Sequence, residues 1–189
     1  SSVFFSAMVG YGFAKFKNRV SDILFLVILS SVMIPFFVRL IPLYLTMVRF
    51  GGADTLWGLI LPNYISVFGI FFMRQYAVTI PDELLQAARI DGASEFQILI
   101  RMVFPLMKSA IVTLLAIKFL WTWNDFLWPL VMLSSPTKLT LPVALAAFKG
   151  HLITRYGPLM AGAVVLLLPV LILFLFLQRQ IVQGIALSG

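Results

Sequence analysis

The sequence predicts an all-α fold, a polytopic bundle of transmembrane helices. Hydrophobic residues make up 61% of the 189-residue chain, whereas charged residues make up only 11%. A soluble domain carries about a quarter charged residues, so this much apolar surface requires lipid as its solvent. The apolar residues also gather in five runs, and a run of about 20 residues crosses a bilayer as a helix. Helices are favoured there because backbone groups in lipid must bond within their own segment.

We expect the five runs to form a single transmembrane domain covering residues 1–189. They are residues 1–14, 23–48, 56–78, 109–133 and 156–178, with residues 79–108 as a patterned cytoplasmic connection. The first run is short, and we expect it to be the end of a longer span in a chain that has lost its N-terminal part. Kinks are predicted at Pro35, Pro62 and Pro169, and Pro42 is expected to end the helix that carries Arg39.

The net charge of +7 has a membrane explanation, since basic residues flank membrane spans and orient them. The basic residues are scattered between apolar runs rather than gathered on one face, which argues against nucleic-acid binding. If successive spans cross the membrane in opposite directions, most loop cations lie on one side of the membrane, which we expect to be cytoplasmic. They are Lys15, Lys17, Arg19, Arg89, Arg101, Lys108 and Arg179. Fewer lie on the opposite side: Arg49, Lys138, Lys149 and Arg155.

The sequence gives little support for catalysis or metal binding. The chain has no cysteine and one histidine, His151, which excludes thiolate and histidine-rich metal sites. It contains no Gly-x-x-x-x-Gly-Lys-Ser/Thr sequence, so it does not cradle ATP phosphates itself. We therefore expect no enzyme, no metal and no bound cofactor. His151 is expected to be solvated in an outer loop or to contact a docking protein.

The connection between the third and fourth runs is longer than a simple link requires, and it is patterned. Pro81 suits the first turn of a helix, and the acidic Asp82 and Glu83 favour the same end. Asp91-Gly92 interrupts the helical pattern, since glycine tolerates the backbone angles of a sharp turn. A second helix should follow, and its apolar face is expected to carry Phe96, Leu99, Ile100 and Val103. Pro105 marks the turn into the next span.

This pattern predicts a cytoplasmic helix–turn–helix with either of two uses. It can dock a protein partner, whose surface would approach closely over the small residues Ala87 and Ala88, or it can lie on the membrane surface. The acidic residues Asp82, Glu83, Asp91 and Glu95 favour a protein partner, because the inner leaflet is itself anionic.

The same stretch resembles the EAA loop of importer permeases in the ATP-binding-cassette superfamily. That signature is Glu-Ala-Ala, three residues, Gly, nine residues and Ile-x-Leu-Pro. Here it reads Gln86-Ala87-Ala88, then Gly92, then Met102-Val103-Phe104-Pro105, with the spacing kept throughout. Gln86 replaces the usual Glu, which removes a charge that would form a salt bridge with the ATPase.

Further stretches, in order along nearly the whole chain, resemble the carbohydrate branch of that family, the maltose-permease-like inner-membrane subunits. They are Tyr11-Gly12-Phe13-Ala14-Lys15, Ile41-Pro42-Leu43-Tyr44, Ala88 to Ser94, Trp123-Asn124-Asp125-Phe126, Thr140-Leu141-Pro142-Val143, Gln178-Arg179 and Val182-Gln183-Gly184.

The resemblance implies a type I importer permease in a bacterial or archaeal plasma membrane. It would form half of a sugar pathway and bind no cofactor, because a partner ATPase dimer hydrolyses ATP. A second permease subunit and an extracytoplasmic solute-binding protein would complete the assembly. The residues implied to couple to the ATPase are Asp82, Glu83, Gln86, Ala87, Ala88, Asp91, Gly92 and Pro105.

Two charges fall inside the fourth run, and an intramembrane charge invites a functional interpretation. Lys118 and Asp125 are about two helical turns apart, which places them on one face but too far for a direct salt bridge. Asn124 and Asp125 could line a wet pathway and bind sugar hydroxyls, and Trp123 could stack on a sugar ring. Alternatively, Asn124-Asp125 caps or packs against a neighbouring helix.

Two other functions remain open. One is a permease for another solute, such as a polyol, a glycerol phosphate ester or a peptide. An anionic solute would require several cationic residues in the pathway, and Lys118 alone is weak support for such a solute. The other is a membrane enzyme or scaffold, although Asp125 is the only acidic residue within the five runs.

Overall fold

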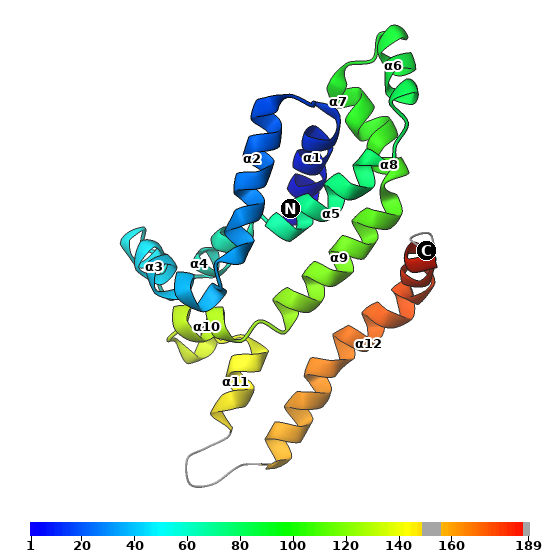
Figure 1. Cartoon of the computed structure of the whole chain (residues 1–189). Coiled ribbons are helices and arrows are strands. Elements are labelled where there is room, and N and C mark those ends of the chain that lie inside the picture. The colour runs from blue at the N-terminus through cyan, green and yellow to red at the C-terminus, as the bar shows by residue number, and fades with distance from the viewer. Residues whose placement is uncertain (149–155, 187–189) are drawn as a thin grey trace. The chain divides into compact units, whose positions relative to one another are not determined.

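The computed structural model of the chain describes residues 1–148 and 156–186 (Figure 1). In this part of the chain every regular element is a helix, so the predicted all-α fold is confirmed. His151, Lys149 and Arg155 lie outside the described residues.

Helices occupy each of the five predicted apolar runs, and further helices lie between the runs. The first half of the chain holds α1 (Ser2–Lys15), α2 (Arg19–Ser30), η1 (Ser31–Met33), α3 (Phe36–Arg49), α4 (Leu56–Ile60), η2 (Leu61–Asn63), α5 (Val67–Val78) and α6 (Asp82–Ile90). The second half holds α7 (Glu95–Ile98), η3 (Leu99–Val103), α8 (Phe104–Leu106), α9 (Lys108–Trp123), α10 (Leu127–Met132), η4 (Pro136–Lys138), α11 (Leu141–Ala147) and α12 (Tyr156–Ala186).

Several of the predicted spans are interrupted. Among the described residues, Leu56–Val78 and Tyr156–Leu177 are long and apolar enough to cross a membrane. Two interrupted pairs raise the number of candidate spans to 4: Arg19–Met33 with Phe36–Arg49, and Glu95–Leu106 with Lys108–Trp123. The predicted run 109–133 is divided between α9 and α10. The Tyr156–Leu177 segment has a mean hydropathy of 2.9 and none of it is buried within the chain, so it needs lipid or a partner to cover it.

The prolines behave in two ways. Pro35 lies between η1 and α3, and Pro62 lies in the short η2, so both mark predicted breaks. The expectation that Pro42 ends its helix is wrong, because α3 continues through Pro42 to Arg49. A break in apolar surroundings would leave several backbone groups without partners, whereas a proline within a helix forfeits one hydrogen bond. Helix α12 likewise continues through Pro169.

The chain divides into two compact units. The first is built mainly from Ser1–Pro35 and Tyr64–Leu115. Its core joins α1, α5, α6, the α7–η3 segment and the start of α9. The buried residues are Ala7, Tyr11, Ala14, Met73, Ala77, Ile80, Leu85, Ala88, Ile98, Leu99, Val103, Met107, Ala110 and Leu114.

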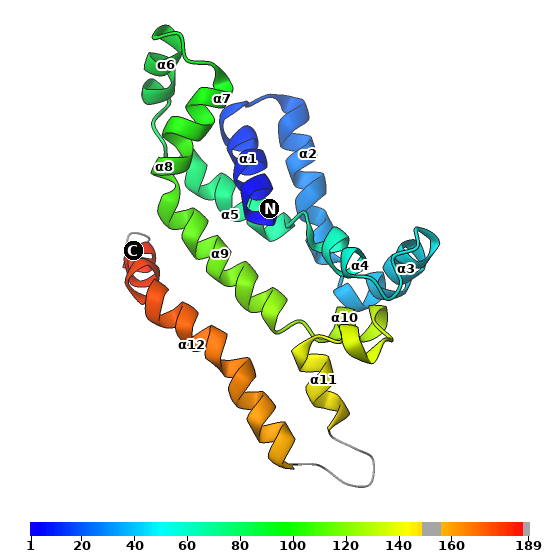
Figure 2. The same cartoon turned by 180° about the vertical axis from the view of Figure 1, so that it is seen from behind.

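Within this unit α1 and α5 lie side by side in both views (Figures 1 and 2). Their backbones approach closely where small residues meet. A Cβ added to Gly10 would lie 2.8 Å from the Arg74 nitrogen and 2.9 Å from the Ile70 carbonyl oxygen. A Cβ added to Gly69 would lie 2.5 Å from the Ser6 hydroxyl oxygen. Small residues at such contacts are the usual means of packing helices in lipid.

The second unit is built from Phe36–Asn63 and the chain between Ala116 and Arg179. Its core is small: Met47, Trp128 and Met132 are buried together beside α3 and α4. The Trp128 indole donates a hydrogen bond of 3.2 Å to the Gly58 carbonyl oxygen. This bond gives the buried indole N–H its partner and fixes α10 to α4.

Candidate functional site

The predicted helix–turn–helix is present at one end of the first unit (Figure 1). Helix α6 ends at Ile90, the chain turns through Asp91 and Gly92, and α7 begins at Glu95. Gly92 has a φ of +82°, a conformation that side-chain-bearing residues rarely adopt. The turn therefore depends on glycine at this position. Because the resemblance to the EAA loop implies a coupling role for this stretch, we call residues 82–105 the coupling element.

A lysine from α1 fixes the start of the coupling element. The Lys15 side chain is only 5% exposed and its ammonium lies 2.7 Å from the Asp82 carboxylate. The same ammonium donates a hydrogen bond to the Ile80 carbonyl oxygen. The hydrogen bond and the charge of Lys15 lower the pKa of Asp82, which remains ionised at the positive end of the α6 dipole.

The two helices of the element are tied together across the turn. Arg89 donates two hydrogen bonds to Glu95, of 2.6 and 3.3 Å, and the bond to Glu95 raises the pKa of Arg89. The N-terminus of α7 carries a capping box. The Gln97 side chain accepts from the Ser94 N–H at 2.8 Å, and the Gln97 N–H donates to the Ser94 hydroxyl at 3.4 Å. These bonds hold the short α7 in place.

Helix α6 has a buried face and an exposed face. Leu85 and Ala88 are buried against the core, at 1% and 8% exposure. Ala87 and Gln86 are exposed. Beside them the large side chains of Ile90 and Phe96 are 85% and 66% exposed. Apolar side chains exposed together outside an apolar run indicate a contact surface.

The second helix differs from the prediction. Leu99 and Val103 are buried as expected, but Ile98 is buried with them, whereas Phe96 and Ile100 are exposed. The reason is that residues 99–103 form a π-helix, whose wider turn changes the spacing of the buried face. Pro105 lies two residues after the end of the π-helix, in α8. Its missing N–H and its ring disfavour an α-helical turn on the preceding residues.

A hollow of about 250 Å³ lies in the surface of the element, between the turn and the π-helix. Its lining mixes apolar and charged side chains: Ala88, Asp91, Ala93, Gln97, Ile98, Arg101 and Met102. The hollow adjoins Ile90 through Asp91, so the element presents both projecting apolar side chains and a recess. A protein surface can match such a shape.

Of the four residues proposed for the pathway, Trp123, Asn124 and Asp125 lie at the junction of α9 and α10, and Lys118 lies within α9. The Asn124 amide donates to the Leu120 carbonyl oxygen at 2.8 Å. The Asp125 carboxylate accepts from the backbone N–H of Trp128. The Trp123 indole donates to the Leu166 carbonyl oxygen on α12 at 3.0 Å, while Lys118 is half-buried. The contacts of Asn124, Asp125 and Trp123 fit the capping and packing alternative. Solute contact by these residues stays a prediction.

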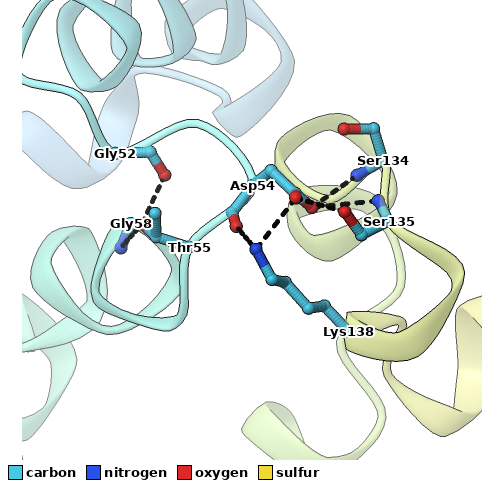
Figure 3. A network of polar contacts seen from close by, with 7 residues as sticks. All are labelled: Gly52, Asp54, Thr55, Gly58, Ser134, Ser135 and Lys138. Atoms are coloured by element: carbon cyan, nitrogen blue, oxygen red, sulfur yellow. Dashed lines mark hydrogen bonds and ion pairs between the residues drawn. The ribbon is translucent and has the colours of Figure 1, made fainter.

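Sequence reasoning missed a polar clamp in the second unit, which Figure 3 shows. The Asp54 carboxylate accepts hydrogen bonds from the N–H groups of Ser134 and Ser135, both at 3.0 Å, and from the Ser135 hydroxyl. Lys138 donates to the Asp54 carbonyl and carboxylate oxygens at 2.6 and 3.0 Å. These bonds, led by those from Ser135, hold the pKa of Asp54 well below its usual range.

Asp54 takes up a left-handed conformation with a φ of +54°, and its N–H donates to the Met132 carbonyl oxygen at 2.8 Å. The clamp therefore joins the loop between α3 and α4 to the chain that follows α10. The neighbouring Gly51-Gly52 is a local signal for a turn. However, no local pattern pairs residues that are 80 or more positions apart.

The fold and the site define a class: a multi-pass helical membrane protein that presents an amphipathic helix–turn–helix outside its apolar runs. The chain belongs to the family described as the binding-protein-dependent transport system inner membrane component, which it matches over residues 2–187. This membership supports the predictions that the chain is a membrane transport component and that it is not an enzyme.

Three relatives illustrate the range of the family. The chain is 39% identical to the arabinooligosaccharides transport system permease protein AraQ of Bacillus subtilis (strain 168), over 100% of this chain and 67% of the relative. It is 36% identical to the lactose transport system permease protein LacG of Rhizobium radiobacter, over 95% and 66%. It is 35% identical to the sn-glycerol-3-phosphate transport system permease protein UgpE of Pectobacterium atrosepticum, over 95% and 65%. The chain thus spans about two thirds of the length of these relatives.

The fold is also similar to a solved structure, the crystal structure of a bacterial ABC transporter involved in the import of the acidic polysaccharide alginate. The TM-score is 0.77 and the identity is 25%, over 94% of this chain and 72% of that chain. The likeness supports the predicted type I permease architecture.

Proposed function

We propose that this chain belongs to a permease subunit of an ATP-driven importer in a bacterial or archaeal cell membrane, where it forms half of a pathway for a sugar. The observation that carries the proposal is the coupling element. It is held by Lys15 at its start and by Arg89 and Glu95 across its turn. It exposes Ile90 and Phe96, which lie outside the apolar runs.

The partners follow from this arrangement together with the family. An ATPase dimer would receive the exposed face of α6, and its closure would displace the coupling element. The largely exposed apolar surface of α12 would contact lipid and a second permease subunit. An extracytoplasmic solute-binding protein would deliver the solute, as the description of the family implies.

A sugar is favoured as the solute because two of the relatives named above carry an arabinooligosaccharide and lactose in their names. A glycerol phosphate ester is the second candidate because of the similarity to UgpE. The two differ in charge. Competition of unlabelled oligosaccharide or glycerol 3-phosphate against labelled solute, taken up by the intact assembly, separates them. Uptake blocked by glycerol 3-phosphate alone would exclude the sugar.

Crosslinking tests the docking of the element. The chain has no cysteine, so a single Ala87→Cys variant reports on one exposed position. Co-expressed with the partner permease and the cognate ATPase, it should form a crosslink to the ATPase whose yield changes with ATP. Leu85→Cys is the control on the same helix, because Leu85 is 1% exposed and should react poorly. An Ala87→Cys variant that reacts with a lipid-phase reagent but not with the ATPase, in an intact assembly, would contradict the docking.

A further inference from the structure

Lys15 occupies an unusual position for a lysine at the end of an apolar helix. Such a side chain normally extends toward water and keeps its charge solvated. The Lys15 side chain is instead only 5% exposed, and its ammonium is directed into the protein. Burying an ammonium is costly unless it is paired and hydrogen-bonded. The arrangement therefore persists because specific acceptors are in place.

Those acceptors belong to two different helices. The Ile80 carbonyl oxygen follows the C-terminal end of α5, where backbone oxygens lack helical partners and a cation is favourable. Asp82 is the first residue of α6, and its carboxylate lies 2.7 Å from the ammonium. A single cation on α1 thus bonds to both sides of Pro81, where the apolar run ends and the coupling element begins.

The remaining attachment of α6 to the first unit is of another kind. Leu85 and Ala88 bury their side chains in the core, and such apolar contacts are non-directional. They permit a helix to slide or tilt with little change in contact area. The bonds of Lys15 have fixed geometry and charge, so they resist displacement of the start of α6 relative to α1.

We propose that Lys15 is a positioning residue for transport: it transmits a displacement of the coupling element into α1 and α5. The inference rests on the proposed function. When a partner moves α6, the Lys15 contacts carry α1 along, so that the helices re-pack together. Without Lys15 the element still docks, but its movement is taken up at the Ile80–Asp82 joint.

The test uses the intact assembly reconstituted with the partner permease, the ATPase and the binding protein. Lys15→Met removes the charge and both hydrogen bonds while keeping an apolar stem, and Lys15→Arg keeps a cation with several donors. Lys17→Met is the matched control, because Lys17 is exposed and acts on Asp82 only through its charge. Residues along a coupling network change coupling by 0.5–2 kcal/mol, about 2- to 30-fold.

We expect Lys15→Met to lower uptake per ATP hydrolysed by about 2- to 30-fold, while basal ATP hydrolysis is kept. Lys15→Arg should restore most of the uptake, and Lys17→Met should leave it unchanged. In the Ala87→Cys background, the Lys15→Met crosslink to the ATPase should still form. Combining Lys15→Met with Asp82→Asn should add little further loss, since both remove the same contact.

Unchanged uptake per ATP in Lys15→Met would overturn the inference, as would an equal loss in Lys17→Met. If Lys15→Met does not accumulate in membranes, Lys15→Gln decides the matter. It keeps a donor for the Ile80 carbonyl oxygen, and full coupling in that variant would exclude the role of the ion pair. Absence of the Ala87→Cys crosslink in the otherwise unchanged chain would instead contradict the proposed function itself.

Discussion

Gly10 lies at a close contact of α1 with α5, and a methyl group added there has no space. The new Cβ would lie 2.8 Å from both the Arg74 nitrogen and the Met73 Cβ, and 2.9 Å from the Ile70 carbonyl oxygen. Two of these atoms are backbone, so a side-chain rotation cannot relieve the clash. The two helices must separate, and overpacking of this kind costs about 1–3 kcal/mol.

Gly12 provides the matched control on the same helix, because a Cβ added there meets no atom within 4 Å. Gly10→Ala and Gly12→Ala both gain about 1 kcal/mol of helix propensity, so the difference between them isolates the packing cost. At about 2–4 °C per kcal/mol, Gly10→Ala should melt about 2–12 °C below Gly12→Ala.

The assay is the loss of monodisperse protein after heating in detergent, followed by size-exclusion chromatography. Uptake by the reconstituted assembly should fall in parallel with the melting temperature. Equal melting temperatures for the two variants would refute the close packing of α1 on α5.

Three further predictions concern the turn, the ion pair and the clamp. Gly92→Ala should cost about 1–2 kcal/mol of local strain, since alanine disfavours a left-handed backbone. Faster hydrogen exchange in α6 and a weaker Ala87→Cys crosslink would show it, and unchanged exchange would contradict it. Arg89→Ala removes a half-exposed ion pair worth at most about 1 kcal/mol. It should therefore lower the crosslink yield while leaving the melting temperature within about 4 °C, and a larger fall would contradict this. Asp54→Asn should reduce the fall in melting temperature as the pH is lowered into the acid range. Because the folded-state pKa of Asp54 is depressed, its stabilisation is present above the unfolded value of about 3.9 and is lost as the pH falls below it. Melting curves from pH about 6 to about 2 test this, and parallel profiles for both proteins would contradict it.

Local signals in the sequence predicted the all-α fold and the helix–turn–helix of residues 82–105. Apolar runs indicate segments that lipid or a core must cover, and Pro81, Asp91-Gly92 and Pro105 mark boundaries through the chemistry of single residues. The buried face of the second helix was predicted only in part. The π-helix at residues 99–103 alters the period, and an apolar pattern read at 3.6 residues per turn does not reveal such a change.

Long-range contacts could not be predicted in the same way. Lys15 and Asp82 are 67 positions apart, and Lys138 and Asp54 are 84 positions apart. From the sequence alone, Lys15 was interpreted as one of the loop cations that orient the membrane spans, and Asp54 was not singled out. Which charges meet depends on how the helices pack, and a single sequence carries no record of that packing.

ATP-driven uptake tests the central claim most directly. Proteoliposomes that contain the assembly, with the binding protein and a labelled oligosaccharide on one side and ATP on the other, should accumulate the sugar only when ATP is present. Ile90→Asp, which places a charge on the most exposed apolar side chain of the coupling element, should abolish accumulation while the assembly still binds its solute-loaded partner. Accumulation that is indifferent both to ATP and to Ile90→Asp would contradict the account.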